Sequence, residues 1–199
     1  MARLIEAFGN AYHRAERSSP AALWGMVGPR VWGDFTTTTI RDALERLTLC
    51  ICAAANSAGP IEWPASFPET VAVSALGVLG WGPPETLAAG RVPEDPAKLG
   101  AENLFLAYFS CFGPEITCGA PGVGVIATVP ARFGLAALYA SMDGTSLASP
   151  STCGALASLL PASAEYRAMP RDETRAQMAR SILHHHCRAI GLKAEFQDR

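Results

Sequence analysis

The amino-acid sequence predicts an α/β fold in which a parallel β-sheet is flanked by helices on both faces. Residues 48–54 form a continuous apolar run, which is typical of a buried strand in a parallel sheet. Residues 70–75 form a second such run, and the segment from Ser146 to about residue 160 has the apolar content of a helix. Because strand-like and helix-like segments alternate along the chain, a parallel sheet covered by helices is expected.

The residues before Thr36 predict a helix and a weak strand. Residues 3–17 place apolar side chains at helical spacing with Glu6 and Arg14 between them, which indicates an amphipathic helix. A signal peptide would need an uninterrupted apolar centre, so none is expected. Residues 23–32 predict a poor strand, because glycines and Pro29 interrupt its apolar residues.

The remaining elements follow from helix caps and short apolar runs. The threonines of residues 36–39 offer N-caps for a helix of about residues 38–47. The helix that begins at Ser146 tolerates Pro150, because a missing N–H does little harm in the first turns. Short strands are expected near residues 115–119, 124–129 and 137–141, and a last helix over about residues 171–190.

Composition and charge argue against several classes of protein. With 199 residues, of which 49% are hydrophobic, the chain can bury a sizeable core. The formal net charge of −2 and the lack of a basic stripe argue against nucleic-acid binding. No apolar run reaches the ~18 residues of a membrane span. We expect a single domain over residues 1–199 that is cytoplasmic as it stands.

The six cysteines indicate a reducing compartment. All except Cys187 lie in apolar or Gly/Ala-rich surroundings, so most are expected to be small buried side chains. Cys50 and Cys52 alternate along a predicted strand and are too constrained to bridge each other easily. The alternative is a zinc site made by His184, His185, His186 and Cys187. Their spacing fits no structural zinc pattern, so no metal site is expected.

A serine stands at the predicted start of a helix in residues 143–150, which read Asp-Gly-Thr-Ser-Leu-Ala-Ser-Pro. At a helix N-terminus, free N–H groups and the positive end of the helix dipole favour developing negative charge. Ser146 is therefore in a good position for a nucleophile. The alternative is that Ser146 or Ser149 caps the helix, which is the usual role of such a serine.

Residues 144–150 resemble the nucleophile signature of the subtilisin-like serine peptidases, Gly-Thr-Ser-Met-Ala-Ser-Pro, with Leu in place of Met. Residues 53–57 resemble the family's Ala-Ala-Gly-Asn segment, and residues 63–75 resemble its Tyr-Pro-Ala-x-Tyr-Pro-x-Val-Ile-Ala-Val-Gly-Ala run. Residues 109–115 and 120–122 are similar to its Phe-Ser-x-x-Gly-Pro and Ala-Pro-Gly segments. These segments occur in the same order as in the family. The resemblance therefore implies the C-terminal two-thirds of the subtilisin-like three-layer fold, with the N-terminal part missing.

The resemblance implies roles for two residues of a catalytic centre. Ser146 would be the nucleophile, and the Asn56 amide, with the backbone N–H of Ser146, would stabilise the tetrahedral oxyanion. Asn56 follows directly on the strand at residues 48–54, and open α/β sheets gather their sites at the C-terminal ends of strands. The alternative for Asn56 is a turn-forming asparagine after a strand.

The resemblance also implies a surface that binds a polypeptide substrate. One segment would occupy the place of the strand that pairs with the substrate backbone: Val31, Trp32 and Gly33. A second would line one wall of the primary specificity pocket: Ala53, Ala54 and Ala55. Ala55 stands where the family has glycine, so its methyl group would crowd the pocket or demand a backbone that the family does not use.

Glu62 lies close to where the family places the floor of that pocket. A carboxylate there would favour the lysine or arginine side chains of a substrate. The alternative is a solvated loop glutamate, which is the commoner role of an acidic side chain.

Two motifs of the family have no counterpart in this sequence. The Asp-Ser/Thr-Gly and His-Gly-Thr-His motifs are absent, and the only histidines are His13 and residues 184–186. A serine hydroxyl without a base is a weak nucleophile. We therefore expect a serine endopeptidase domain that is inactive alone, with Asp and His supplied by an upstream segment or a second chain. The alternative is a non-catalytic pseudopeptidase or peptide-binding module.

Residues 78–102 interrupt the resemblance with turn-forming glycines and prolines. The family pattern would use a much shorter link here. We expect a tolerated surface insertion, and a functional loop is the alternative. No cofactor is expected. Calcium supports many subtilases, but no matching ligand cluster is visible in this sequence.

Overall fold

The computed structural model describes residues 38–45, 48–82, 84, 86, 88–129 and 138–192. The chain divides into two compact units, Met1–Thr39 and Ile40–Arg199, and the architecture below is that of the second. Residues 38–45 are helical, in line with the helix predicted there. The helix expected over residues 3–17 and the weak strand expected over residues 23–32 lie outside the described residues.

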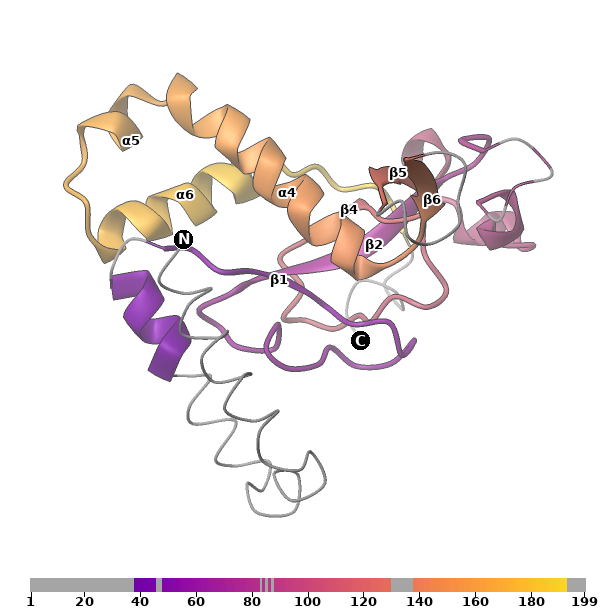
Figure 1. Cartoon of the computed structure of the whole chain (residues 1–199), viewed down its shortest axis with the longest axis horizontal. Helices are drawn as coiled ribbons and strands as arrows, with labels where there is room; N and C mark the ends of the chain where they lie inside the picture. The colour runs from indigo at the N-terminus through magenta and orange to yellow at the C-terminus, as the bar shows by residue number, and fades with distance from the viewer. Residues whose placement is uncertain are drawn as a thin grey trace, which may run out of the picture. The chain divides into compact units, whose positions relative to one another are not determined.

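A mixed sheet forms the centre of the second unit (Figure 1). Its middle strand is β2 (Val71–Val78), which is buried along its whole length except at Val78. β1 (Ile51–Ala53) and β4 (Cys118–Pro121) lie parallel to β2 on opposite sides of it, and β3 (Leu104–Leu106) runs antiparallel to its last residues. The register pairs Ile51 with Val71, Val73 with Cys118, and Leu76 with Leu106.

The predicted α/β class is confirmed, with one difference in the sheet. The parallel pairs that we expected are present, but β3 adds an antiparallel strand that was not predicted. A second, two-stranded antiparallel sheet is formed by β5 (Val125–Thr128) and β6 (Tyr139–Met142), close to two of the predicted short strands.

Helix α4 (Thr145–Leu159) packs on β1, β2 and β4. Its buried residues recur every three or four positions, as a helix with one face on a sheet requires: Thr145, Ala148, Thr152 and Leu156. Pro150 lies in its second turn, as predicted. The helix buries small and medium side chains, so it lies close to the strands (Figure 1).

The C-terminal part adds two further helices. α5 (Ala164–Ala168) was not predicted and begins at Ser163, whose hydroxyl accepts a hydrogen bond from the Tyr166 N–H at 3.1 Å. α6 (Glu173–His186) begins at Asp172 and packs against α4. It ends four residues before the predicted limit, because Cys187 takes an extended backbone conformation with φ −70° and ψ 143°. Within the described residues, no helix is long and apolar enough to cross a membrane.

Short 3₁₀ helices occur in two of the segments that connect these elements. Three of them lie within the predicted insertion or at its end: η1 (Ala89–Arg91), η2 (Pro96–Lys98) and η3 (Ala101–Asn103). Another 3₁₀ helix, η5 (Leu160–Ala162), follows α4 directly.

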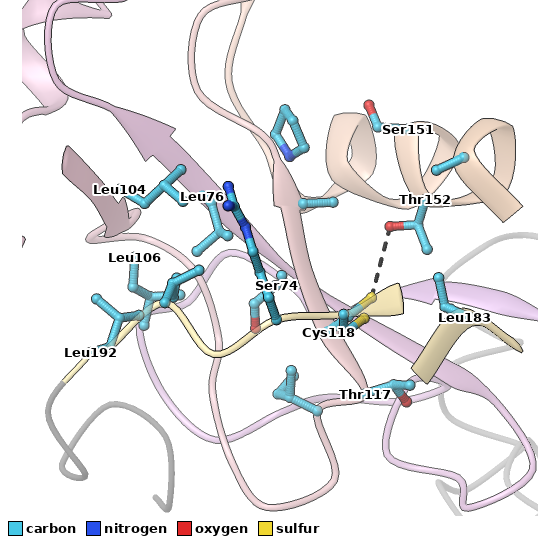
Figure 2. A pocket seen from close by; sticks show the side chains of 18 of the residues that line it. Ser74, Leu76, Leu104, Leu106, Thr117, Cys118, Ser151, Thr152, Leu183 and Leu192 are labelled. Carbon is cyan, nitrogen blue, oxygen red and sulfur yellow. Dashed lines mark hydrogen bonds between the residues drawn. The ribbon is translucent and has the colours of Figure 1, made fainter. Parts of the chain in front are cut away.

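A cavity of about 570 Å³ lies between the sheet, α4 and the segment that follows α6 (Figure 2). Its walls are mainly apolar, with Leu76, Leu106, Leu183 and Leu192 among them. Cys118 also lines it, with its Sγ 3.9 Å from the Thr152 hydroxyl. Neither Ser146 nor Asn56 lines this cavity, so it is separate from the residues that the sequence singled out.

The prediction that most cysteines are buried was wrong. All six are free thiols, but only Cys111 is fully buried, while Cys153 and Cys187 are exposed. Cys153 lies among apolar neighbours in the sequence, yet it is exposed on α4 and is not one of the residues that the helix buries. Apolar neighbours in the sequence therefore do not predict whether a thiol in this helix is buried.

Candidate active site

Ser146 is exposed in the first turn of α4, directly after the buried Thr145. The turn before it requires glycine, because Gly144 has a φ of 151°, which L-residues rarely adopt. The Gly144 N–H donates to the Gly122 carbonyl at 2.8 Å, which fixes the entry to the helix. Among the described residues, the Ser146 N–H and hydroxyl have no hydrogen-bond partner, so both can interact with a bound molecule.

The helix-capping alternative does not describe these serines. The N-cap of α4 is Gly144, which has no side chain, so neither Ser146 nor Ser149 caps this helix. Ser149 instead donates its hydroxyl hydrogen to the Ile51 carbonyl at 3.0 Å, which ties α4 to β1.

Asn56 and Thr145 are joined by two hydrogen bonds. The Asn56 Oδ1 accepts from the Thr145 N–H at 2.9 Å and from the Thr145 hydroxyl at 3.0 Å. A backbone N–H can only donate, so the amide atom that faces it must be the oxygen. The Asn56 Nδ2 is thereby directed away from Thr145. It lies over Gly144, where a Cβ built on that glycine would be 3.8 Å from it. The amide N–H groups are therefore held beside the start of α4.

The strand end of β1 brings Asn56 to this position. The Ala54 N–H donates to the Val73 carbonyl at 3.0 Å, continuing the parallel pairing past the end of β1, and Ala54 is completely buried. The Ala55 carbonyl then accepts from the Cys111 N–H at 3.0 Å. Ala55 has a φ of 87°, in the left-handed region that disfavours a Cβ. The expectation that Ala55 crowds the pocket or demands a backbone that the family does not use stays a prediction.

Glu62 is brought back beside the same strand end. Its N–H donates to the Ala54 carbonyl at 3.2 Å, and its Oε1 accepts from the Ser57 hydroxyl at 2.5 Å. Its side chain is exposed. Ala53, Ala54, Ala55, Asn56 and Glu62 are therefore neighbours, whereas Val31, Trp32 and Gly33 lie outside the described residues.

One ion pair close to Ser146 was missed by sequence reasoning. The Arg91 Nε donates to the Asp143 Oδ2 at 2.8 Å, and the Asp143 Oδ1 accepts from the Gly124 N–H at 2.8 Å. The side chains are 31% and 15% exposed, so the pair is only partly solvated. The hydrogen bond to Asp143 raises the pKa of Arg91 above its ordinary value. Arg91 belongs to the predicted insertion, and nothing in the local sequence pointed to Asp143.

In the part of the chain that the structure describes, no histidine or carboxylate hydrogen-bonds to Ser146. The histidines of residues 184–186 are exposed at the end of α6, and the His186 Nδ1 contacts the Ile182 carbonyl at 2.8 Å. His13 lies outside the described residues. No cluster of three or more possible metal ligands occurs in the same part of the chain, the residues of the zinc alternative included.

Comparison with known proteins gives a family and a fold. The family model described as "Subtilase family" matches residues 11–193. A solved structure, titled as a cold adapted subtilisin-like serine proteinase, is similar with a TM-score of 0.54 and 16% sequence identity. The similarity covers 81% of this chain but 46% of that one, so the chain spans about half the length of its structural neighbour. No curated protein matches.

Proposed function

The chain belongs to the subtilase family, and on that premise we propose that it carries the nucleophile and the oxyanion-binding groups of a serine endopeptidase. The observation that carries the proposal is the pair of hydrogen bonds between Asn56 and Thr145. They fix the asparagine amide beside the helix N-terminus that bears an unpartnered serine. On this proposal, the Asn56 Nδ2 and the Ser146 N–H would both donate to one oxyanion.

This arrangement suits peptide-bond hydrolysis through an acyl-enzyme. The Ser146 Oγ would attack the carbonyl carbon of the scissile bond while a base takes its proton. The carbonyl oxygen would become an oxyanion that accepts hydrogen bonds from the Ser146 N–H and the Asn56 amide. The positive end of the α4 dipole would add to the same stabilisation. Collapse of the intermediate, with the proton returned from the base to the leaving nitrogen, would expel the amine and leave the acyl group on Ser146, which water would then hydrolyse.

The described residues do not supply the general base that this mechanism needs. We propose that Asp and His come from an upstream segment or a second chain, which would complete the site next to Ser146. His13 is the first candidate for a histidine within this chain. Without a base, the oxyanion groups alone would leave only a small part of the rate.

A preference for basic substrates would follow from Glu62. Its carboxylate is held by the Ser57 hydroxyl beside Ala54, which would line the primary specificity pocket. An anchored carboxylate there favours lysine and arginine side chains through charge-assisted hydrogen bonds.

The second candidate is a non-catalytic peptide-binding module. Ala55 favours it, because an alanine with a φ of 87° replaces the glycine expected before the asparagine. The unpartnered donors at the start of α4 would then bind a carbonyl or carboxylate group of a peptide without cleaving it.

Labelling with a fluorophosphonate probe distinguishes the two candidates. The chain would be treated alone and together with a chain that carries the Asp and His motifs, with Ser146→Ala as the control. Labelling that depends on Ser146 in the second sample supports the peptidase. Labelling of the chain alone would identify an internal base, for which His13→Ala is the next variant. No Ser146-dependent labelling in either sample would support the binding module.

A further inference from the structure

Arg91 is bound on two sides at the end of η1. Its Nε donates to the Asp143 Oδ2 at 2.8 Å, and its Nη1 donates to the Tyr108 hydroxyl oxygen at 2.7 Å. The guanidinium carbon also lies 5.3 Å from the centroid of the Tyr108 ring. A guanidinium held by three contacts has little freedom to leave its carboxylate partner.

Asp143 links Arg91 to a second segment of the chain. Its other oxygen accepts from the Gly124 N–H at 2.8 Å, while the Trp81 indole N–H donates to the Gly124 carbonyl at 3.0 Å. Both backbone polar groups of Gly124, directly before β5, are therefore held by side chains from other segments. Trp81 and Arg91 both belong to the segment 78–102, so this segment contacts Asp143 directly and also contacts Gly124, which Asp143 binds.

Asp143 is connected to Ser146 through a rigid turn. Gly144 donates its N–H to the Gly122 carbonyl, and a Cβ on Gly122 would lie 2.9 Å from the Gly144 carbonyl oxygen and 2.6 Å from the Ala75 Cβ. Thr145 is completely buried and bonded to Asn56. We therefore expect a shift of Asp143 to be transmitted to Ser146 or Asn56, because close packing leaves the turn little room to absorb it.

We propose that Arg91 is a positioning residue for the serine peptidase site: acting through Asp143, it holds the turn of residues 143–146 and with it the Ser146 Oγ and N–H. The proposal rests on the proposed function for its chemical consequence. It changes the interpretation of residues 78–102 from a tolerated surface insertion to a supporting element of the site.

Charge gives Arg91 a second effect on the same site. Asp143 lies three positions before Ser146 and carries a carboxylate that is largely shielded from water. An unpaired carboxylate near the oxyanion donors would oppose the negative charge that develops on the substrate carbonyl. Arg91 compensates this charge, so loss of Arg91 should be more harmful than loss of the carboxylate itself.

The experiment measures the fluorophosphonate labelling rate of Ser146 together with the melting midpoint, in the complete chain complemented as above. For Arg91→Ala we expect labelling to slow roughly ten- to a hundredfold, because small misplacements of a reacting group cost about this much. Arg91→Lys should recover part of the rate, since it restores the charge but not the contacts with Asp143 and Tyr108 together. Arg188→Ala, which breaks the exposed ion pair with Glu102, is the matched control and should leave the rate unchanged.

A double variant separates positioning from general destabilisation. Arg91→Ala/Asp143→Asn should be labelled at the rate of Asp143→Asn alone, and faster than Arg91→Ala. This holds because the asparagine oxygen can still accept from Gly124 and no unpaired charge remains. Equal labelling of Arg91→Ala and the parent chain would overturn the inference. So would independent, additive effects of the two substitutions.

Hydrogen exchange keeps the inference testable if the parent chain itself is not labelled. Failure of labelling would count against the proposed function alone. Arg91→Ala should then still exchange the Gly144 and Thr145 amide hydrogens several-fold faster than the parent and Arg188→Ala. Unchanged exchange at these two amides would contradict the positioning role, whatever the chain catalyses.

Discussion

Asn56 and Thr145 lie 89 positions apart in the sequence, yet the Asn56 Oδ1 accepts hydrogen bonds from both the backbone N–H and the hydroxyl of Thr145. One end of the amide is thus used for structure, and the other end remains available as a donor. This division of roles within one side chain allows the structural and chemical contributions of Asn56 to be measured separately.

Replacing Asn56 by alanine should affect both stability and reactivity. Thr145 is completely buried, so its N–H and hydroxyl would lose their partner, at a cost of about 1–3 kcal/mol in the free energy of unfolding. Loss of an oxyanion donor should slow acylation of Ser146 by roughly 10²–10³, a magnitude taken from subtilisin itself. Urea unfolding and the labelling rate measure the two effects.

Asn56→Asp is the matched variant. Aspartate keeps an acceptor for Thr145 and should retain most of the stability, but it has no N–H to donate and adds a negative charge. We expect slow labelling in a stable protein. Rapid labelling of Asn56→Asp would show that the amide nitrogen has no part in the chemistry.

Ala55→Gly should stabilise the fold. The φ of 87° at Ala55 costs an L-residue roughly 1–2 kcal/mol, of which glycine recovers a part after its own entropic penalty, leaving a gain of about 0.5–1 kcal/mol. Ala53→Gly, in the regular strand β1, should instead destabilise the protein by a similar amount. Denaturant midpoints compare the two. A loss of stability in both variants would show that the Ala55 backbone is not strained.

The thiols should react with iodoacetamide in an order set by exposure and pKa. Burial raises the pKa of Cys52 to about 11, with a smaller contribution from Cys50, and burial likewise raises the pKa of Cys118 to about 11. At pH 8 only about 0.1% of either thiol would be ionised. Of the two exposed thiols, Cys153 should be alkylated before Cys187, because burial raises the pKa of Cys187. Mass spectrometry of partly alkylated protein gives the order, and early modification of Cys118 would contradict it.

The same pKa values predict how stability depends on pH. A thiol whose pKa is raised on folding stabilises the native state while it is protonated. This contribution is complete below the ordinary value of 9.0 and is lost as the pH rises through about 11. The free energy of unfolding should fall over this window. The fall should be smaller in Cys52→Ala/Cys118→Ala, and an identical fall in this variant would rule out the thiols as its cause.

Glu62→Gln tests the preference for basic substrates. The glutamine can still accept from the Ser57 hydroxyl, but the charge is gone. Because the side chain is exposed, we expect the preference for lysine or arginine probes over apolar ones to fall by only about fivefold, which corresponds to about 1 kcal/mol. Peptidyl phosphonates with the two kinds of side chain measure the ratio. An unchanged ratio would mean that Glu62 is a solvated loop residue.

The sequence was informative where a long pattern and a local rule agreed. The apolar run of residues 70–75 and the Gly-Thr-Ser turn predicted β2 and the start of α4, because burial and helix geometry act on neighbouring residues. β3 was missed, since Leu104–Leu106 is a strand only through its pairing with the end of β2. α5 was missed because five residues carry too little periodicity to distinguish a helix from a turn.

The candidate site likewise contains residues that the sequence predicted and residues that it did not. The resemblance pointed to Ser146 and Asn56, and the structure brings the residues around them together. The ion pair of Arg91 with Asp143 could not be predicted, because the two residues are 52 positions apart and depend on the path of a glycine- and proline-rich segment. The role of Ser146 itself stays a prediction.

The measurement that tests the central claim most directly is the mass-spectrometric location of a fluorophosphonate adduct in the complemented chain. The parent, Ser146→Ala and Ser149→Ala would be compared, because Ser149 lies in the same helix but has its hydroxyl bonded to the Ile51 carbonyl. We predict one adduct, on Ser146, that is kept in Ser149→Ala and lost in Ser146→Ala. An adduct that persists in Ser146→Ala, or no adduct at all, would contradict the assignment of Ser146 as the nucleophile.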